Sequence, residues 1–168
     1  MATKGETAMA RTEYVIEPGK QELLSTTVFD APRELVFKAY TDPNLLAQWW
    51  GPRRYETKID TFEARAGGSW RMRNIGANGE EHAFRGVNHD VVAPERICST
   101  FEYEGVPGHV ALQTATFEAL GNKTRVVEHS IFESVMDRDG MVASGMQEGA
   151  DESVERLVEL LDKMKAGK

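Results

Sequence analysis

The C-terminal part of the chain has the clearest hydrophobic pattern. From Met141 to Lys165, apolar and small residues recur every three or four positions, which predicts one long amphipathic helix. This stripe contains Met146, Ala150, Ser153, Leu157, Leu160, Leu161 and Met164. Acidic residues lie off the stripe, so one side of the helix is expected to face solvent and the other to pack against the protein.

Alternating apolar and polar residues, typical of strands, dominate the chain between residues 21 and 133. Strands are predicted at Gln21–Phe29, Tyr55–Ala64, Ser69–Ile75, Glu81–Val92, Arg96–Tyr103, His109–Leu120 and Lys123–Phe132. Turn signals between them, such as Ala77-Asn78-Gly79, favour antiparallel hairpins. Arg11–Glu17 alternates weakly and is predicted to be either an extra edge strand or an arm.

Two short helices are predicted at Pro32–Thr41 and Pro43–Trp49, because an aspartate and a proline mark the start of each. With a loop at residues 133–140, we expect about seven strands and three helices. The fold class is α+β, with a curved antiparallel sheet gripping the C-terminal helix. Residues 1–10 are expected to form a disordered tail, and residues 11–168 a single domain.

The N-terminal half of the long helix carries small residues, namely Gly145, Gly149, Ala150 and Ser153 beside Met146. Small side chains fill less volume, so helix and sheet could leave a ligand cavity there. The alternative is that these residues only allow the helix to pack closely against the sheet. The C-terminal half is rich in leucine and is predicted to belong to the core.

The net charge of −7 over 168 residues argues against a nucleic-acid partner. Cys98 is the single cysteine, which excludes an intramolecular disulfide and cysteine-rich zinc sites and favours a buried thiol. The N-terminus lacks the apolar core of a signal peptide. No apolar stretch approaches the roughly 18 residues that a bilayer span requires, so a cytoplasmic protein with no membrane partner is expected.

The histidines share no spacing typical of metal ligands, so no metal site is predicted. They are His82, His89, His109 and His129. The chain contains no nucleophile elbow and no glycine-rich phosphate loop, since Gly67-Gly68 leads into a predicted strand. No cofactor is expected.

Strand alternation places polar candidates on the sheet face that turns toward the helix. If Phe117 faces inward, so does Gln113, and if Val126 faces inward, so does Glu128. A buried carboxylate is costly unless it has a partner or keeps its proton. A register shift of one residue would place His129 inward instead, and the pattern leaves both arrangements open.

The aromatic pair Trp49-Trp50 ends the second short helix. One indole is expected in the core, and the other could line or cap the mouth of a pocket. Trp70 has the same two interpretations, core residue or ligand contact.

The run VFDAPRELVFKAYTDPNLLAQWWGP at Val28–Pro52 resembles the opening of a bacterial family homologous to the C-terminal domain of the activator of the heat-shock chaperone ATPase. Later pieces fit the same family in order: GGSWR at 67–71, FRGV at 84–87, APERI at 93–97, TATFE at 114–118, KTRV at 123–126 and SGMQEGADESVERLVELL at 144–161.

This family is similar to the wider START-like, or SRPBCC, helix-grip superfamily, which includes birch-pollen-allergen-type proteins and polyketide cyclases. The resemblance implies a six- or seven-stranded antiparallel sheet wrapped round a long C-terminal helix, with a cavity between them. It implies no invariant catalytic residues. Relatives tend to have an aliphatic residue in place of Glu128 and an aromatic one in place of Asn88. If both face inward, this cavity is unusually polar for the family.

Three functions are compatible with these expectations. The first is a binding protein for a hydrophobic or aromatic small molecule. Its cavity would be lined by Trp50, Trp70, Met72, Phe84, Gln113, Phe117, Glu128, Met146 and Ala150. The second is an enzyme of the polyketide cyclase or aromatase type, with Glu128 or a histidine as general acid or base. The third is a protein-interaction role as a chaperone cofactor. Homodimerisation through an edge strand or the N-terminal arm is compatible with each, and no residue fixes it.

Overall fold

Eight antiparallel strands form one sheet within residues 10–167, the part of the chain that the computed structural model describes. The sheet order is β1-β2-β8-β7-β6-β5-β4-β3. The strands are β1 Thr12–Val15, β2 Glu22–Phe29, β3 Tyr55–Phe62, β4 Ser69–Gly76, β5 Glu81–Val92, β6 Arg96–Tyr103, β7 Val110–Leu120 and β8 Lys123–Ile131. All seven predicted strands are present. The eighth, β1, confirms the edge-strand interpretation of Arg11–Glu17.

The predicted disordered tail lies outside the described residues apart from Ala10. Within the part of the chain that is described, no helix is both long and apolar enough to cross a membrane.

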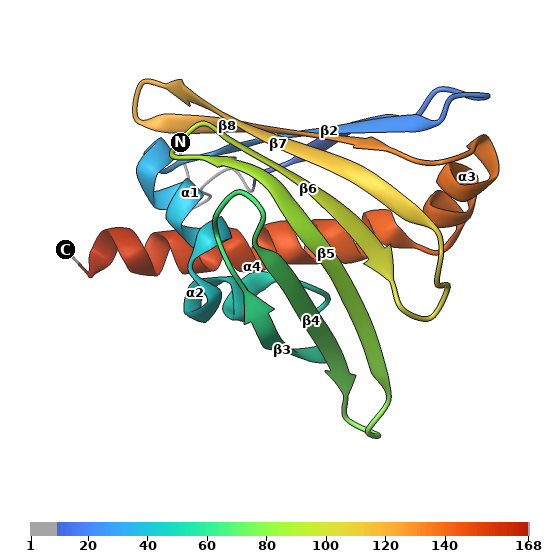
Figure 1. Cartoon of the computed structure of the whole chain (residues 1–168). Helices are drawn as coiled ribbons and strands as arrows, with labels where there is room; N and C mark the ends of the chain where they lie inside the picture. Colours follow the sequence, from blue (N-terminus) through green and yellow to red (C-terminus); the bar gives the residue numbers. More distant parts are fainter. Residues whose placement is uncertain (1–9, 168) are drawn as a thin grey trace, which may run out of the picture.

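The sheet is strongly curved around helix α4, Met146–Ala166. In Figure 1 the strands turn from β2 and β8, which run almost along α4, to β4 and β5, which cross it steeply. Register shifts between Ile59 and Thr61 on β3 and between Asn88 and Asp90 on β5 mark irregularities of the bulge type, which bend the sheet further.

Helices α1, Arg33–Thr41, and α2, Pro43–Trp49, follow β2 as predicted and pack against α4. The Asp42 side chain caps α2 by accepting a hydrogen bond of 2.9 Å from the Asn44 amide. The Trp49 indole donates a hydrogen bond of 2.9 Å to the Ala39 carbonyl, so this tryptophan joins the two helices in the core.

The prediction of one helix from Met141 onward was wrong at its N-terminal end. The chain is already helical in α3, Val135–Ala143, where a loop was expected, and it breaks before α4 begins. At the break, Gly145 has a φ of 85°, a left-handed conformation that glycine adopts without strain. The periodicity continues through Gly145, which is why a single helix was predicted.

The C-terminal half of α4 belongs to the core, as its leucines predicted. Leu157, Leu160 and Leu161 are 0, 7 and 2% exposed. They pack into one cluster with Phe29 from β2 and Phe117 from β7. This end of the space between helix and sheet is therefore filled.

Candidate functional site

The core on the inner face of the sheet is divided into two clusters. The larger one contains Phe29, Phe117, Val126 and the leucines of α4. The smaller one contains Leu23, Ala111 and Phe132, with Met146 packed against it. Between the clusters, the inner-face positions of three neighbouring strands are polar or small.

The same interruption occurs on each of these strands. On β8, Glu128 and Ser130 lie between the core residues Val126 and Phe132. On β7, Gln113 and Ala115 lie between Phe117 and Ala111. On β2, Ser25 and Thr27 lie between Phe29 and Leu23. The register aligns the three interruptions, because Glu128 lies opposite Ser25 on one side and Ala115 on the other. They therefore form one continuous area.

The helix that covers this area has a corresponding interruption. Ala150 is half-buried and lies on the stripe of α4 between Met146, which contacts the smaller cluster, and Leu157, which belongs to the larger one. We call the region bounded by Ser25, Gln113, Ala115, Glu128, Met146 and Ala150 the gap.

Two small residues of α4 support the close-packing alternative. The Ser153 hydroxyl accepts a hydrogen bond of 2.9 Å from the Gly51 amide, and a Cβ at Gly149 would lie 3.5 Å from Pro52. These residues bring α4 close to the segment between α2 and β3. The small-residue stripe thus serves helix packing at Gly149 and Ser153, whereas Ala150 borders the gap.

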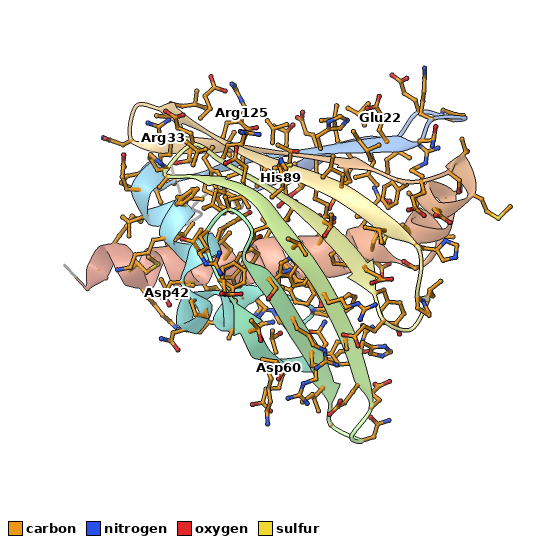
Figure 2. The ribbon with its side chains drawn as sticks, viewed as in Figure 1. Glu22, Arg33, Asp42, Asp60, His89 and Arg125 are labelled. Atoms are coloured by element: carbon orange, nitrogen blue, oxygen red, sulfur yellow. The ribbon has the colours of Figure 1, made fainter. Side chains whose placement is uncertain are left out.

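Glu128 faces the helix, which answers the question that the sequence left open. It alternates with the buried residues Val126 and Ser130. His129 lies on the opposite face, where its Nε2 is 2.5 Å from a Glu22 carboxylate oxygen. Figure 2 shows Glu22 on the side of the sheet that is turned away from α4.

The Glu128 side chain is desolvated and yet accessible. Burial raises the pKa of its carboxyl above the ordinary value. The residue is nevertheless exposed, although it lies on the inner face. Within residues 10–167, no hydrogen-bond or salt-bridge partner reaches its carboxylate.

Two tyrosines lie on the same side of the sheet as this carboxyl. Burial raises the pKa of Tyr40 on α1, and the Glu128 charge raises it further. Burial also raises the pKa of Tyr14 on β1, with contributions from Asp151 and Glu128. The Tyr14 hydroxyl donates a hydrogen bond of 2.9 Å to Asp151 on α4, which ties the sheet edge to the helix beside the gap.

All nine predicted cavity residues lie on the concave side of the sheet, but they differ in whether they border the gap or are buried in the core. Gln113, Glu128, Met146 and Ala150 border the gap. Trp50 and Phe84 are half-buried and contact each other edge to face, with ring centroids 5.1 Å apart. Trp70, Met72 and Phe117 are 6, 4 and 1% exposed, so they are almost entirely within the core.

Asn88 does not make the gap more polar. It is 2% exposed, and its amide nitrogen donates a hydrogen bond of 2.8 Å to the Glu63 carbonyl. Backbone bonds to Gly67 and Gly68 complete this contact with the segment between β3 and β4. Asn88 therefore holds a turn, a role that strand alternation alone does not reveal.

Sequence reasoning missed Tyr14, Ser25 and Tyr40, all of which lie near Glu128. Tyr14 and Ser25 occupy one cross-strand row with Glu128, because β1 pairs with β2 and β2 pairs with β8. That row could have been found only from the pairing of distant strands. Tyr40 carries a signal in the sequence, because it lies at helical spacing from Val36 and Phe37, which are buried in α1.

No cluster of three metal-ligating side chains occurs in the described part of the chain. Two surface hollows lie outside the gap. One, of about 400 Å³, is lined by Arg71, Arg85 and Glu102, which take part in ion pairs. The other, of about 460 Å³, lies between β1, β2 and the C-terminal half of α4. Neither includes Glu128, so neither matches the interruption of the core.

The fold and the interrupted core define a helix-grip protein of the α+β class. The family model for the Activator of Hsp90 ATPase homolog 1-like protein matches residues 30–162, and the chain belongs to this family. No curated protein matches the chain.

Several solved structures share the fold. A protein from Arthrobacter aurescens is 25% identical with a TM-score of 0.83, and the match covers 90% of this chain and 91% of that one. A protein from Rhodobacter sphaeroides is 25% identical with a TM-score of 0.82, covering 90% and 99%. An AHSA1 protein from Silicibacter pomeroyi, 20% identical with a TM-score of 0.72, covers 85% and 99% and is similar in fold alone.

Proposed function

We propose that this protein binds a hydrophobic or aromatic small molecule in the gap between the sheet and α4. The observation that carries the proposal is the aligned interruption of the core on β2, β7, β8 and α4, with Glu128 at its centre. A folded core is normally packed without voids, and an interruption at one level of four elements loses packing energy. A ligand would restore those contacts.

The chemistry of the gap fits ligand binding. Met146, Ala150 and Ala115 provide apolar surface, whereas Ser25, Gln113 and Glu128 provide polar atoms at its floor. Apolar walls with a few converging polar groups are typical of small-molecule sites. Trp50 and Phe84, which pack together on the same concave side, extend the aromatic surface.

The test uses a neutral apolar fluorophore, N-phenyl-1-naphthylamine, with a variant that fills the gap. Ala115→Phe places a ring beside Glu128 and should weaken probe binding by about tenfold or more. Thr116→Phe on the outer face of the same strand is the matched control and should bind as the wild type does. Equal binding by the wild type and both variants would place the site elsewhere, and no binding by any of them would contradict the proposal.

A second candidate is an enzyme of the cyclase or aromatase type. The observation that favours it is the combination of a desolvated carboxyl, Glu128, with the Tyr40 hydroxyl, whose pKa the Glu128 charge raises. A carboxyl with a raised pKa can act as a general acid near neutral pH. Native mass spectrometry of protein from its own source tests both candidates. A co-purified molecule that keeps its mass on incubation supports binding, and one that is converted supports catalysis.

A further inference from the structure

The inner-face positions around Glu128 carry no positive charge. On β2 they are Leu23, Ser25, Thr27 and Phe29; on β7, Ala111, Gln113, Ala115 and Phe117; on β8, Thr124, Val126 and Ser130. The arginines and histidine of β8 point to the outer face, where Arg125 pairs with Glu118 and His129 with Glu22. Figure 2 shows Arg125 on this outer side.

The titratable groups of other elements that respond to the Glu128 charge also carry no positive charge. Tyr40 faces it from α1 and Tyr14 from β1, and Asp151 from α4 accepts the hydrogen bond of the Tyr14 hydroxyl. The groups identified around Glu128 in residues 10–167 are thus two neutral phenols, with the exposed Asp151 carboxylate at the edge of the sheet, and no cationic side chain is among them.

We infer that the ligand carries a protonated nitrogen, as an amine or amidine, which pairs with the Glu128 carboxylate while its apolar part lies against Ala115, Ala150 and Met146. This inference rests on the proposed function and names its ligand class. An anionic ligand would place like charges together in a desolvated space whenever Glu128 is ionised, which is strongly unfavourable. A cationic ligand would give the unpartnered carboxylate the hydrogen-bonded ion pair that the protein itself does not provide.

Pairing would also change the protonation of Glu128. Burial without a partner raises the pKa of this carboxyl, so the empty site holds its proton more readily than an ordinary glutamate does. A cation beside the carboxylate lowers the pKa again. Binding of a protonated amine below the raised pKa is therefore expected to release a proton from Glu128, and the affinity should increase as the pH rises through that range.

The test compares three probes with the same ring and chain length: 2-phenylethylamine, 2-phenylethanol and phenylacetate. Isothermal titration of the full chain should give the amine an affinity about tenfold or more above that of the alcohol, and phenylacetate the weakest binding. Glu128→Gln should remove the advantage of the amine and leave alcohol binding within about twofold. Glu118→Gln, on the outer face, is the control and should change neither the affinity for the amine nor that for the alcohol. Titrations repeated at decreasing pH, in two buffers of different ionisation enthalpy, should show proton release that appears toward the acid end of the series and with the amine alone.

If the alcohol binds as tightly as the amine, or if Glu128→Gln leaves amine binding intact, the inference is overturned while the proposed function stands. If none of the three probes binds but N-phenyl-1-naphthylamine does, the inference again fails alone. If that fluorophore does not bind either, both fail. Tighter binding of phenylacetate than of the amine would reverse the charge assignment and overturn the inference directly.

Discussion

Tyr14 on the edge strand β1 donates a hydrogen bond of 2.9 Å to Asp151 on α4. The two residues are far apart in the sequence, and their contact closes the side of the gap next to Ser25, which lies opposite Tyr14. The edge of the sheet is therefore attached to the helix that the sheet encloses.

Tyr14→Phe should destabilise the protein by about 0.5–1.5 kcal/mol, because it removes this hydrogen bond and leaves the ring in place. Urea denaturation measures the change. The double variant Tyr14→Phe/Asp151→Ala should lose less stability than the two single variants lose in total, since both substitutions disrupt one contact. Strict additivity would show that the contact contributes nothing to stability.

Glu128→Leu should stabilise the ligand-free protein at neutral pH by about 1–2 kcal/mol, because it removes a desolvated carboxyl without a partner. The pH dependence should change as well. Since the pKa is raised in the folded state, the folded protein holds the proton more tightly than the unfolded chain does. Stability of the wild type should therefore fall as the pH rises from about 4.3, the ordinary glutamate value, through the raised pKa.

In Glu128→Leu that part of the pH dependence should disappear. Thermal melting at a series of pH values gives both quantities, with Glu118→Leu on the outer face as the control. A clear loss of melting temperature in Glu128→Leu at neutral pH would show that the carboxyl has a favourable partner and that the description of the gap is wrong.

Arg156→Ala should destabilise the protein by about 1–3 kcal/mol. The guanidinium donates to the carbonyls of Gly51 at 2.8 Å and Gln48 at 2.9 Å, and it thereby caps the end of α2 from α4. Arg53→Ala is the comparison, because its exposed ion pairs with Glu155 and Glu159 are screened by solvent and should contribute much less to stability. Denaturation curves that show the same loss of stability for Arg156→Ala and Arg53→Ala would contradict the capping role.

Gly145→Ala should cost about 1–2 kcal/mol, because alanine resists the left-handed conformation that separates α3 from α4. Gly140→Ala is the opposite case. Gly140 lies inside α3 with open space around its Cα, so alanine there should raise stability by up to about 1 kcal/mol. Stabilisation by both substitutions, measured by thermal melting, would mean that the break between the helices is not maintained in solution.

Periodicity predicted most of the fold because strands and helix ends depend on local residues. The Asp42 cap of α2 illustrates this, since it acts on a neighbour in the chain. The leucines of α4 were recognised from their own helical spacing, although they pack against distant strands. The break at Gly145 was missed because a glycine fits a helical stripe as well as it fits a left-handed turn, and the packing of α3 decides between them. Buried Arg138 anchors α3 through the carbonyls of Glu17 and Glu22, a contact between distant segments.

The candidate site was predictable in part. Alternation identified Glu128 and Gln113 as inner-face residues once Val126 and Phe117 were assigned to the core. It could not choose between Glu128 and His129, because a strand shifted by one residue is equally regular. Ser25, Tyr14 and Tyr40 join the site through strand pairing and helix packing, so their proximity to Glu128 follows from the tertiary structure.

We propose that a small molecule binds at the interruption between the two core clusters. Methyl NMR spectra of the wild-type protein during titration with N-phenyl-1-naphthylamine test it most directly. Saturable shifts should appear at the methyl groups of Ala115, Met146 and Ala150, while the exposed outer-face residues Leu112 and Ile131 stay unchanged. Shifts confined to Leu112 and Ile131, or no saturable shift at all, would contradict the claim.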